Sequence, residues 1–139
     1  MIQAHQPEIA VHTPLRATFR WVLAVFFVVA GANHFRSPAT YLGMIPPWLP
    51  WPEGLNAISG ACEILGGVGI LVPRMRMAAG WGLVALLVAV FPANLHVALM
   101  GRMPGFDFSA TTLWLRLPLQ AALVAWVAWV AIAGNPRRS

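Results

Sequence analysis

Glu63, His34 and His96 are the residues of this chain best suited to acid–base chemistry. A desolvated carboxyl group favours its protonated form, and beside an imidazole it can pass a proton to or from a bound molecule. Glu63 lies near the middle of an apolar run, Leu55 to Val72, where an ionisable group at bilayer depth costs about 2.5–3.5 kcal/mol. We therefore expect Glu63 to face a polar pocket with partners from neighbouring segments.

Four further polar or aromatic residues are candidates for ligand binding: Asn33, Asn94, Tyr41 and Trp48. Two positions along a regular helix turn side chains about 200° apart, so Asn94 and His96 can share one pocket only if Pro92 distorts the helix. The alternative is that Glu63 only joins helices through hydrogen bonds, which average about 0.6 kcal/mol in membrane bundles. So small a gain would hardly offset the burial of an acid.

Metal and thiol chemistry have little support in the sequence. Two histidines and a carboxylate are suitable ligands for zinc or iron, but no closely spaced motif such as HExxH occurs, so no residue is assigned to a metal. Cys62 is the single cysteine, which excludes an intrachain disulfide and a CxxC redox pair.

The composition is that of an integral membrane protein. Of 139 residues, 59% are hydrophobic and 9% are charged, whereas a soluble domain has about 25% charged residues. The net charge of +5 comes from arginines at segment ends and loops, and no basic run accompanies an aromatic platform. The expected surroundings are therefore the lipid bilayer, with no nucleic acid as partner.

Apolar segments of spanning length must position the candidate residues. They predict an all-α fold, an integral membrane four-helix bundle with spans near residues 15–35, 55–72, 77–99 and 113–133. Pro92 predicts a kink in the third span, and Pro118 is placed in the first turns of the fourth, where proline is tolerated. The prolines and tryptophans of RSPATYLGMIPPWLPWPEG predict a Pro/Trp-rich interfacial loop between helices 1 and 2 that covers the bundle.

The chain divides into a flexible polar tail over residues 1–15, a single four-span membrane domain over 16–134 and a basic C-terminal tail over 135–139. Four spans place both termini on one side of the membrane. Arginines are more numerous on that side, which predicts a multi-pass protein with N- and C-termini in the cytoplasm. Glu63 and the polar ends of the first and third spans then lie in the outer half of the bilayer.

Three pieces of sequence resemble the DoxX-like family of small bacterial membrane proteins: GANHFRSPATYLGMIPPWLPWP, ISGACEILGGVGILVP and FPANLHVAL. The resemblance covers about Trp21 to Arg102 and implies a four-helix bundle in the bacterial inner (cytoplasmic) membrane. Some relatives of the wider group are associated with thiosulfate:quinone oxidoreductase or with membrane oxidoreductase complexes. The resemblance therefore implies a quinone as ligand and a redox partner protein, but it transfers no catalytic residue.

These observations together predict the membrane subunit of a redox system, which binds a quinone-like or small hydrophobic ligand in an outer-half polar pocket. Glu63 would accept a proton or anchor the ligand, with His34 and His96 as partners and the loop around Pro46 to Pro52 as a lid. The alternative is a non-enzymatic membrane scaffold or anchor for a partner complex. Two questions stay open: whether the chain is itself an enzyme, and whether it forms a homodimer through the glycine-rich face of the second span.

Overall fold

The computed structural model describes residues 13–133, and this range is all-helical, as predicted. Its elements are α1 (Thr13–Arg36), α2 (Pro38–Leu42), α3 (Pro52–Gly69), α4 (Arg76–Ala89), α5 (Phe91–Met100), α6 (Ala110–Val127) and a final π-helical turn, η1 (Ala128–Ile132). The first part of the predicted N-terminal tail and the whole predicted C-terminal tail lie outside the described residues. Residues 13–15 of the predicted N-terminal tail belong instead to the first turn of α1.

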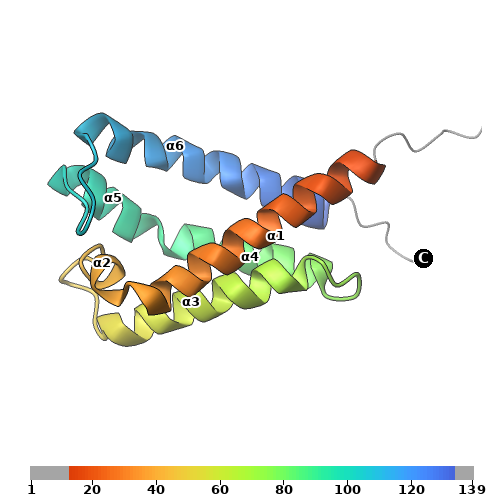
Figure 1. Ribbon diagram of the computed structural model, residues 1–139, viewed down its shortest axis with the longest axis horizontal. Coiled ribbons are helices and arrows are strands. Elements are labelled where there is room, and N and C mark those ends of the chain that lie inside the picture. The colour runs from red at the N-terminus through yellow and green to blue at the C-terminus, as the bar shows by residue number, and fades with distance from the viewer. Residues whose placement is uncertain (1–12, 134–139) are drawn as a thin grey trace, which may run out of the picture.

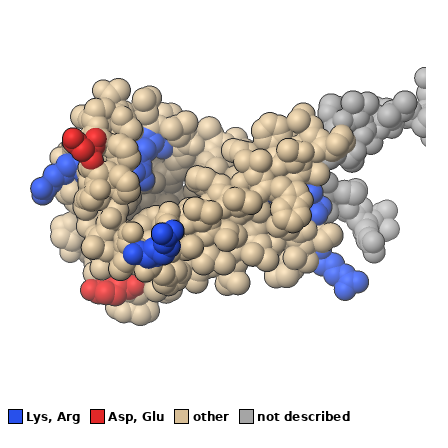
Figure 2. All heavy atoms as spheres, in the orientation of Figure 1, with Lys and Arg blue, Asp and Glu red and all other residues tan. Residues whose placement is uncertain are grey.

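Three helical segments are long and apolar enough to cross a membrane: Pro14–Arg36, Arg76–Met100 and Ala110–Ile132. Many large apolar side chains on their outer surfaces are exposed, among them Val25, Val88 and Leu119. On the face in Figure 2, charged side chains gather mainly towards the two ends of the molecule, with a broad uncharged band between them. This distribution is typical of an integral membrane protein.

Glycines allow α1 and α3 to pack closely side by side (Figure 1). A Cβ atom on Gly60 would lie 2.9 Å from the carbonyl oxygen of Gly31, and one on Gly67 would lie 2.9 Å from that of Ala24. Gly66, on the same helix, packs against Leu83 of α4. The glycine-rich face of α3 is therefore filled by helices of its own chain, at distances that a larger side chain would prevent.

Prolines shape the other two long segments. The segment Arg76–Met100 is broken at Val90, where the backbone N–H groups of Ala93 and Asn94 both donate to the Val90 carbonyl oxygen, at 3.1 and 3.2 Å. The predicted kink at Pro92 is therefore confirmed, because proline cannot supply the N–H that a continuous helix needs. The predicted position of Pro118 in the first turns is wrong, because α6 already begins at Ala110 and Pro118 lies inside it.

The buried apolar side chains form two separate cores. The larger one joins the middle of α1 to the end of α3, to α4, to the end of α6 and to η1, through residues such as Phe27, Leu83 and Val130. The smaller one joins the loop after α2 to α5, α6 and the segment between them, with Met44, Val97 and Leu113 among its members. In Figure 1 the pair α1–α3 and the pair α5–α6 lie apart where α2 is found. At the other end α4 packs on α3, and η1 contacts both α4 and α1.

The predicted Pro/Trp-rich loop contains the short helix α2, followed by turns. It meets the segment between α5 and α6, since a Cβ atom on Gly43 would lie 2.5 Å from Pro104, and one on Gly105 would lie 2.9 Å from the Thr40 hydroxyl. Trp48 and Trp51 are exposed, which suits side chains at a membrane interface. The loop therefore connects the two helix pairs at the end where they lie apart.

Candidate functional site

A cavity of about 760 Å³ lies between the two cores, and residues of all six α-helices line it. Most of its wall is apolar, with Phe27, Leu87 and Leu123 contributed by three different helices. Two other lining residues, Ile58 and Leu119, are 50% and 65% exposed, so the cavity opens onto the apolar outer surface of the molecule. This is the form of a site for a hydrophobic molecule, with a few polar groups to orient it.

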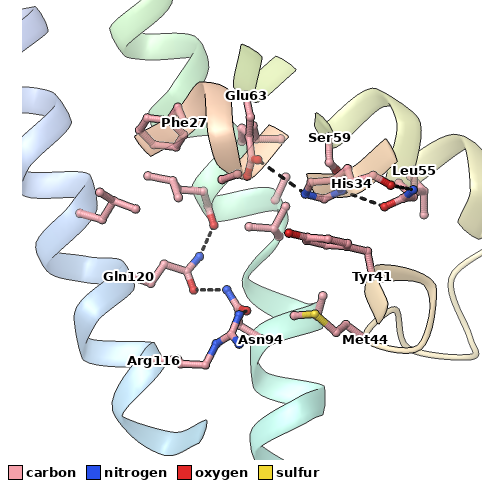
Figure 3. Close-up of a pocket in the computed structure, with 18 of the residues that line it drawn as sticks. Phe27, His34, Tyr41, Met44, Leu55, Ser59, Glu63, Asn94, Arg116 and Gln120 are labelled. Atoms are coloured by element: carbon pink, nitrogen blue, oxygen red, sulfur yellow. Dashed lines mark hydrogen bonds and ion pairs between the residues drawn. The ribbon is translucent and has the colours of Figure 1, made fainter. Parts of the chain in front are cut away.

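One wall carries the predicted acid and its imidazole partner, with His34 on α1 and Glu63 on α3 (Figure 3). The His34 Nε2 atom lies 3.6 Å from Glu63 Oε2, and the two side chains are only 11% and 14% exposed. This carboxylate oxygen is buried and has no hydrogen-bond partner within residues 13–133, since His34 Nε2 lies just beyond hydrogen-bond distance. The sequence-based expectation that a partner from a neighbouring helix accompanies Glu63 is therefore confirmed at the level of geometry.

Asn56, also on α3, determines which ring nitrogen of His34 carries hydrogen. Its Nδ2 group donates to the His34 carbonyl oxygen at 3.1 Å, so its Oδ1 atom is the one that faces His34 Nδ1, at 2.8 Å. An amide oxygen can only accept, so Nδ1 must be the donor, and a neutral ring then has a bare Nε2 directed at Glu63. Two bare acceptors facing each other at 3.6 Å would repel, so the arrangement favours one proton on either Nε2 or the carboxyl group.

Tyr41 of α2 stacks on the His34 ring, with centroids 3.8 Å apart and planes inclined by 26°. Burial raises the pKa of the Tyr41 hydroxyl above its ordinary value of 10.0; the charge of Glu63 adds to this rise and that of Arg116 opposes it. The hydroxyl thus lies within the electrostatic influence of both cavity walls, and Figure 3 shows it directed between them. It remains protonated at neutral pH and can donate a hydrogen bond to an occupant.

The opposite wall carries a series of directed hydrogen bonds (Figure 3). Gln120 Nε2 donates to the carbonyl oxygen of Leu87, in the last turn of α4, where helix carbonyls lack their regular donors. Gln120 Oε1 then accepts from Asn94 Nδ2 at 3.0 Å, and Asn94 Oδ1 accepts from the Arg116 guanidinium at 3.2 Å. The helix break at Pro92 therefore orients two amides, and these position a cation at the cavity.

The structure brings four of the predicted site residues to the cavity: His34, Glu63, Tyr41 and Asn94. The other three, Asn33, His96 and Trp48, do not line it. His96 lies two positions beyond Asn94 within one regular helix and so turns to another side, while Trp48 is 70% exposed on the outside of the loop. The break at Pro92 comes before both Asn94 and His96 and does not bring them together.

Besides Ser59, three polar residues at the cavity were not among the predicted site residues: Asn56, Arg116 and Gln120. A sequence signal existed for each. Asn56 lies seven residues before Glu63, which is two helical turns and hence the same face. Arg116 and Gln120 are four residues apart in an otherwise apolar helix, so they also share a face.

Metal ligands do not gather here. Within residues 13–133 no group of three or more histidine, cysteine, aspartate or glutamate side chains is close enough to hold a metal ion. The polar groups of the cavity instead suit proton exchange on one wall and hydrogen bonding to acceptor oxygens on the other.

A family model described as a domain of unknown function (DUF8561) matches residues 23–131. The matched range contains both cores and every residue that lines the cavity. No curated protein and no solved structure matches the chain.

Proposed function

We propose, from the premise that this chain belongs to the DUF8561 family, that it is an inner-membrane protein of DoxX-like type that binds a quinone-like or small hydrophobic molecule. The cavity between the two cores would hold this ligand, and the protein would serve as the membrane subunit of a redox system. A redox partner protein would supply the electrons.

The proposed topology has four spans, with α3 added to the three long apolar segments. α3 has 18 residues, enough to cross most of the hydrocarbon layer, and it packs along α1. Its polar residues Asn56 and Glu63 line the cavity and so can be buried away from lipid. Both termini would be cytoplasmic, which places α2 and the cavity's polar walls towards the outer side.

The observation that carries the proposal is the placement of the His34 imidazole beside the Glu63 carboxyl group, with Nε2 3.6 Å from Oε2, on the wall of an apolar cavity. Reduction of a quinone to a quinol takes up electrons and protons in equal number. The His34–Glu63 pair would deliver a proton to a carbonyl oxygen of the ligand as electrons arrive from the partner protein, and would then be reprotonated from the aqueous side. Asn56 keeps Nδ1 protonated, so that Nε2 stays directed at the acid.

The test compares Glu63→Gln with the native protein in lipid nanodiscs, using decylubiquinone and a chemical reductant. A glutamine can still donate a hydrogen bond to Nε2 but has no acidic proton to transfer. We expect quinone affinity to change little and the rate of quinol formation to fall by about 100-fold or more, the usual contribution of a general acid. Glu53→Gln, at the exposed start of the same helix, is the matched control and should leave both quantities unchanged.

Equal rates and equal binding in the native and Glu63→Gln proteins would remove the basis for the proton role. The alternative, a membrane scaffold for a partner complex, predicts a different result. In that case Glu63→Gln lowers thermal stability or the recovery of a partner protein, while no quinone binds either form.

A further inference from the structure

Arg116 carries a positive charge on the cavity wall with no counter-ion among the described residues. Of the carboxylates in residues 13–133, Glu63 faces His34, whereas Glu53 and Asp107 are exposed. With one proton on either group, as the facing acceptors favour, the His34–Glu63 pair is neutral as a unit. The residues that line the cavity therefore carry a net charge of about one positive unit, contributed by Arg116.

The guanidinium is only partly satisfied by the protein. Its hydrogen bonds go to Asn94 Oδ1 at 3.2 Å and to the Met103 sulfur at 2.8 Å. Both partners are uncharged, and a guanidinium has about five N–H donors, so most of them have no partner among the described residues. The position of the guanidinium is fixed by its partner Asn94, which is itself oriented by Gln120 and, through it, by the Leu87 carbonyl.

We infer that the ligand of this cavity is a lipophilic anion, whose negatively charged oxygen group is bound by Arg116 and the Tyr41 hydroxyl and whose apolar body fills the space lined by Phe27 and Leu123. The inference rests on the proposed ligand cavity and adds the charge of its occupant. A half-buried charge without a counter-ion is costly, and an oxyanion would relieve that cost through hydrogen bonds stronger than those to a neutral carbonyl. The class includes long-chain carboxylates, and a phospholipid headgroup offers the same chemistry.

The experiment uses cis-parinaric acid and its methyl ester as fluorescent probes in zwitterionic nanodiscs that contain the full chain. Binding is read as energy transfer from tryptophan, since Trp126 lines the cavity. Arg116→Gln removes the charge and Arg116→Lys keeps it, while Arg102→Gln is the control at an exposed arginine of the loop after α5.

We expect the native protein and Arg102→Gln to bind the acid at least about tenfold more tightly than the ester, a difference of about 1.4 kcal/mol. Arg116→Gln should abolish this preference without changing ester affinity, and Arg116→Lys should retain most of it. Unchanged ester affinity shows that the cavity is intact. Adding anionic phospholipid to the nanodiscs distinguishes the two sources, because displacement of the acid at a low lipid fraction would identify the headgroup as the natural occupant.

Equal affinity for acid and ester in the native protein, or a preference that survives Arg116→Gln, would overturn the inference. If the ester and decylubiquinone nevertheless bind, the proposed cavity function stands and only the anionic class is wrong. If no probe binds at all, both fall together.

Discussion

Replacing Asn56 by alanine removes two hydrogen bonds to His34, one with the ring Nδ1 at 2.8 Å and one to the backbone carbonyl oxygen at 3.1 Å, from a position that is only 7% exposed. Side-chain hydrogen bonds between membrane helices contribute about 0.6 kcal/mol on average and up to about 1.7 kcal/mol. Two such bonds, one of them to a ring that lies beside Glu63, predict a loss of about 1–3 kcal/mol in the free energy of unfolding. Denaturant titration in mixed micelles measures this loss.

The same substitution tests the proton count at the His34–Glu63 pair. In the native protein a neutral His34 must carry hydrogen on Nδ1, because the Asn56 oxygen cannot donate. Nitrogen NMR of isotope-labelled histidine should therefore show His34 as the Nδ1–H form, assigned by its disappearance in His34→Gln. In Asn56→Ala the Nδ1 hydrogen loses its acceptor, and we expect the proton to move to Nε2, where Glu63 can accept it.

Asn33→Ala is the matched control, since Asn33 precedes His34 and its side chain makes no hydrogen bond within residues 13–133. It should cost much less stability than Asn56→Ala and leave the His34 signal unchanged. A native His34 protonated on Nε2 with a bare Nδ1 would refute the reasoning, and so would equal destabilisation by the two alanine variants.

Two further predictions concern the packing and the aromatic residue around this pair. Gly60→Ala would place a Cβ atom 2.7 Å from that of His34, so we expect thermal unfolding to show about 1–3 kcal/mol of destabilisation. Gly82→Ala, where no atom lies within 4 Å of the added Cβ, should cost almost nothing. Similar losses at both sites would contradict the close α1–α3 contact. Tyr41 is the single tyrosine, so phenolate absorbance should report its pKa above 10.0 in the folded protein and, since Arg116 opposes the rise, higher still in Arg116→Gln. Because the pKa of Tyr41 is raised on folding, the contribution of its protonated hydroxyl to stability is complete below pH 10.0 and is lost as pH rises through the pKa of the folded protein. A folded protein in which Tyr41 titrates at 10.0 would contradict this prediction.

Features that depend on one segment of the chain could be predicted from the sequence. Pro92 lacks an N–H group wherever it lies, so a helix break near it follows from the residue itself. The rarity of a carboxylate in an apolar run likewise requires a partner for Glu63, and the structure supplies His34. In both cases the physical requirement comes from a single residue and its own segment. For Glu63, the residue that meets the requirement lies elsewhere in the chain.

Features that depend on the relative rotation of helices could not be predicted in the same way. The sequence shows that Asn94 and His96 point in different directions, but not which of them faces Glu63's cavity; the structure places Asn94 there. The role of Arg116 depends on the amide series from the Leu87 carbonyl, which requires α4, α5 and α6 to be positioned together. A basic residue near the start of a span resembles an interfacial anchor until that arrangement is known.

The exposed rim of the cavity has a consequence for how any occupant should be measured. Ile58 and Leu119 belong both to the cavity and to the outer apolar surface, so in a bilayer the space is contiguous with acyl chains rather than water. A volume of about 760 Å³ is large enough for lipid tails to enter whenever it is otherwise vacant. A bound molecule therefore exchanges with lipid acyl chains, and its occupancy depends on its mole fraction in the membrane. A change of lipid thickness or fluidity will then shift this occupancy even when the aqueous concentration of the molecule is held constant.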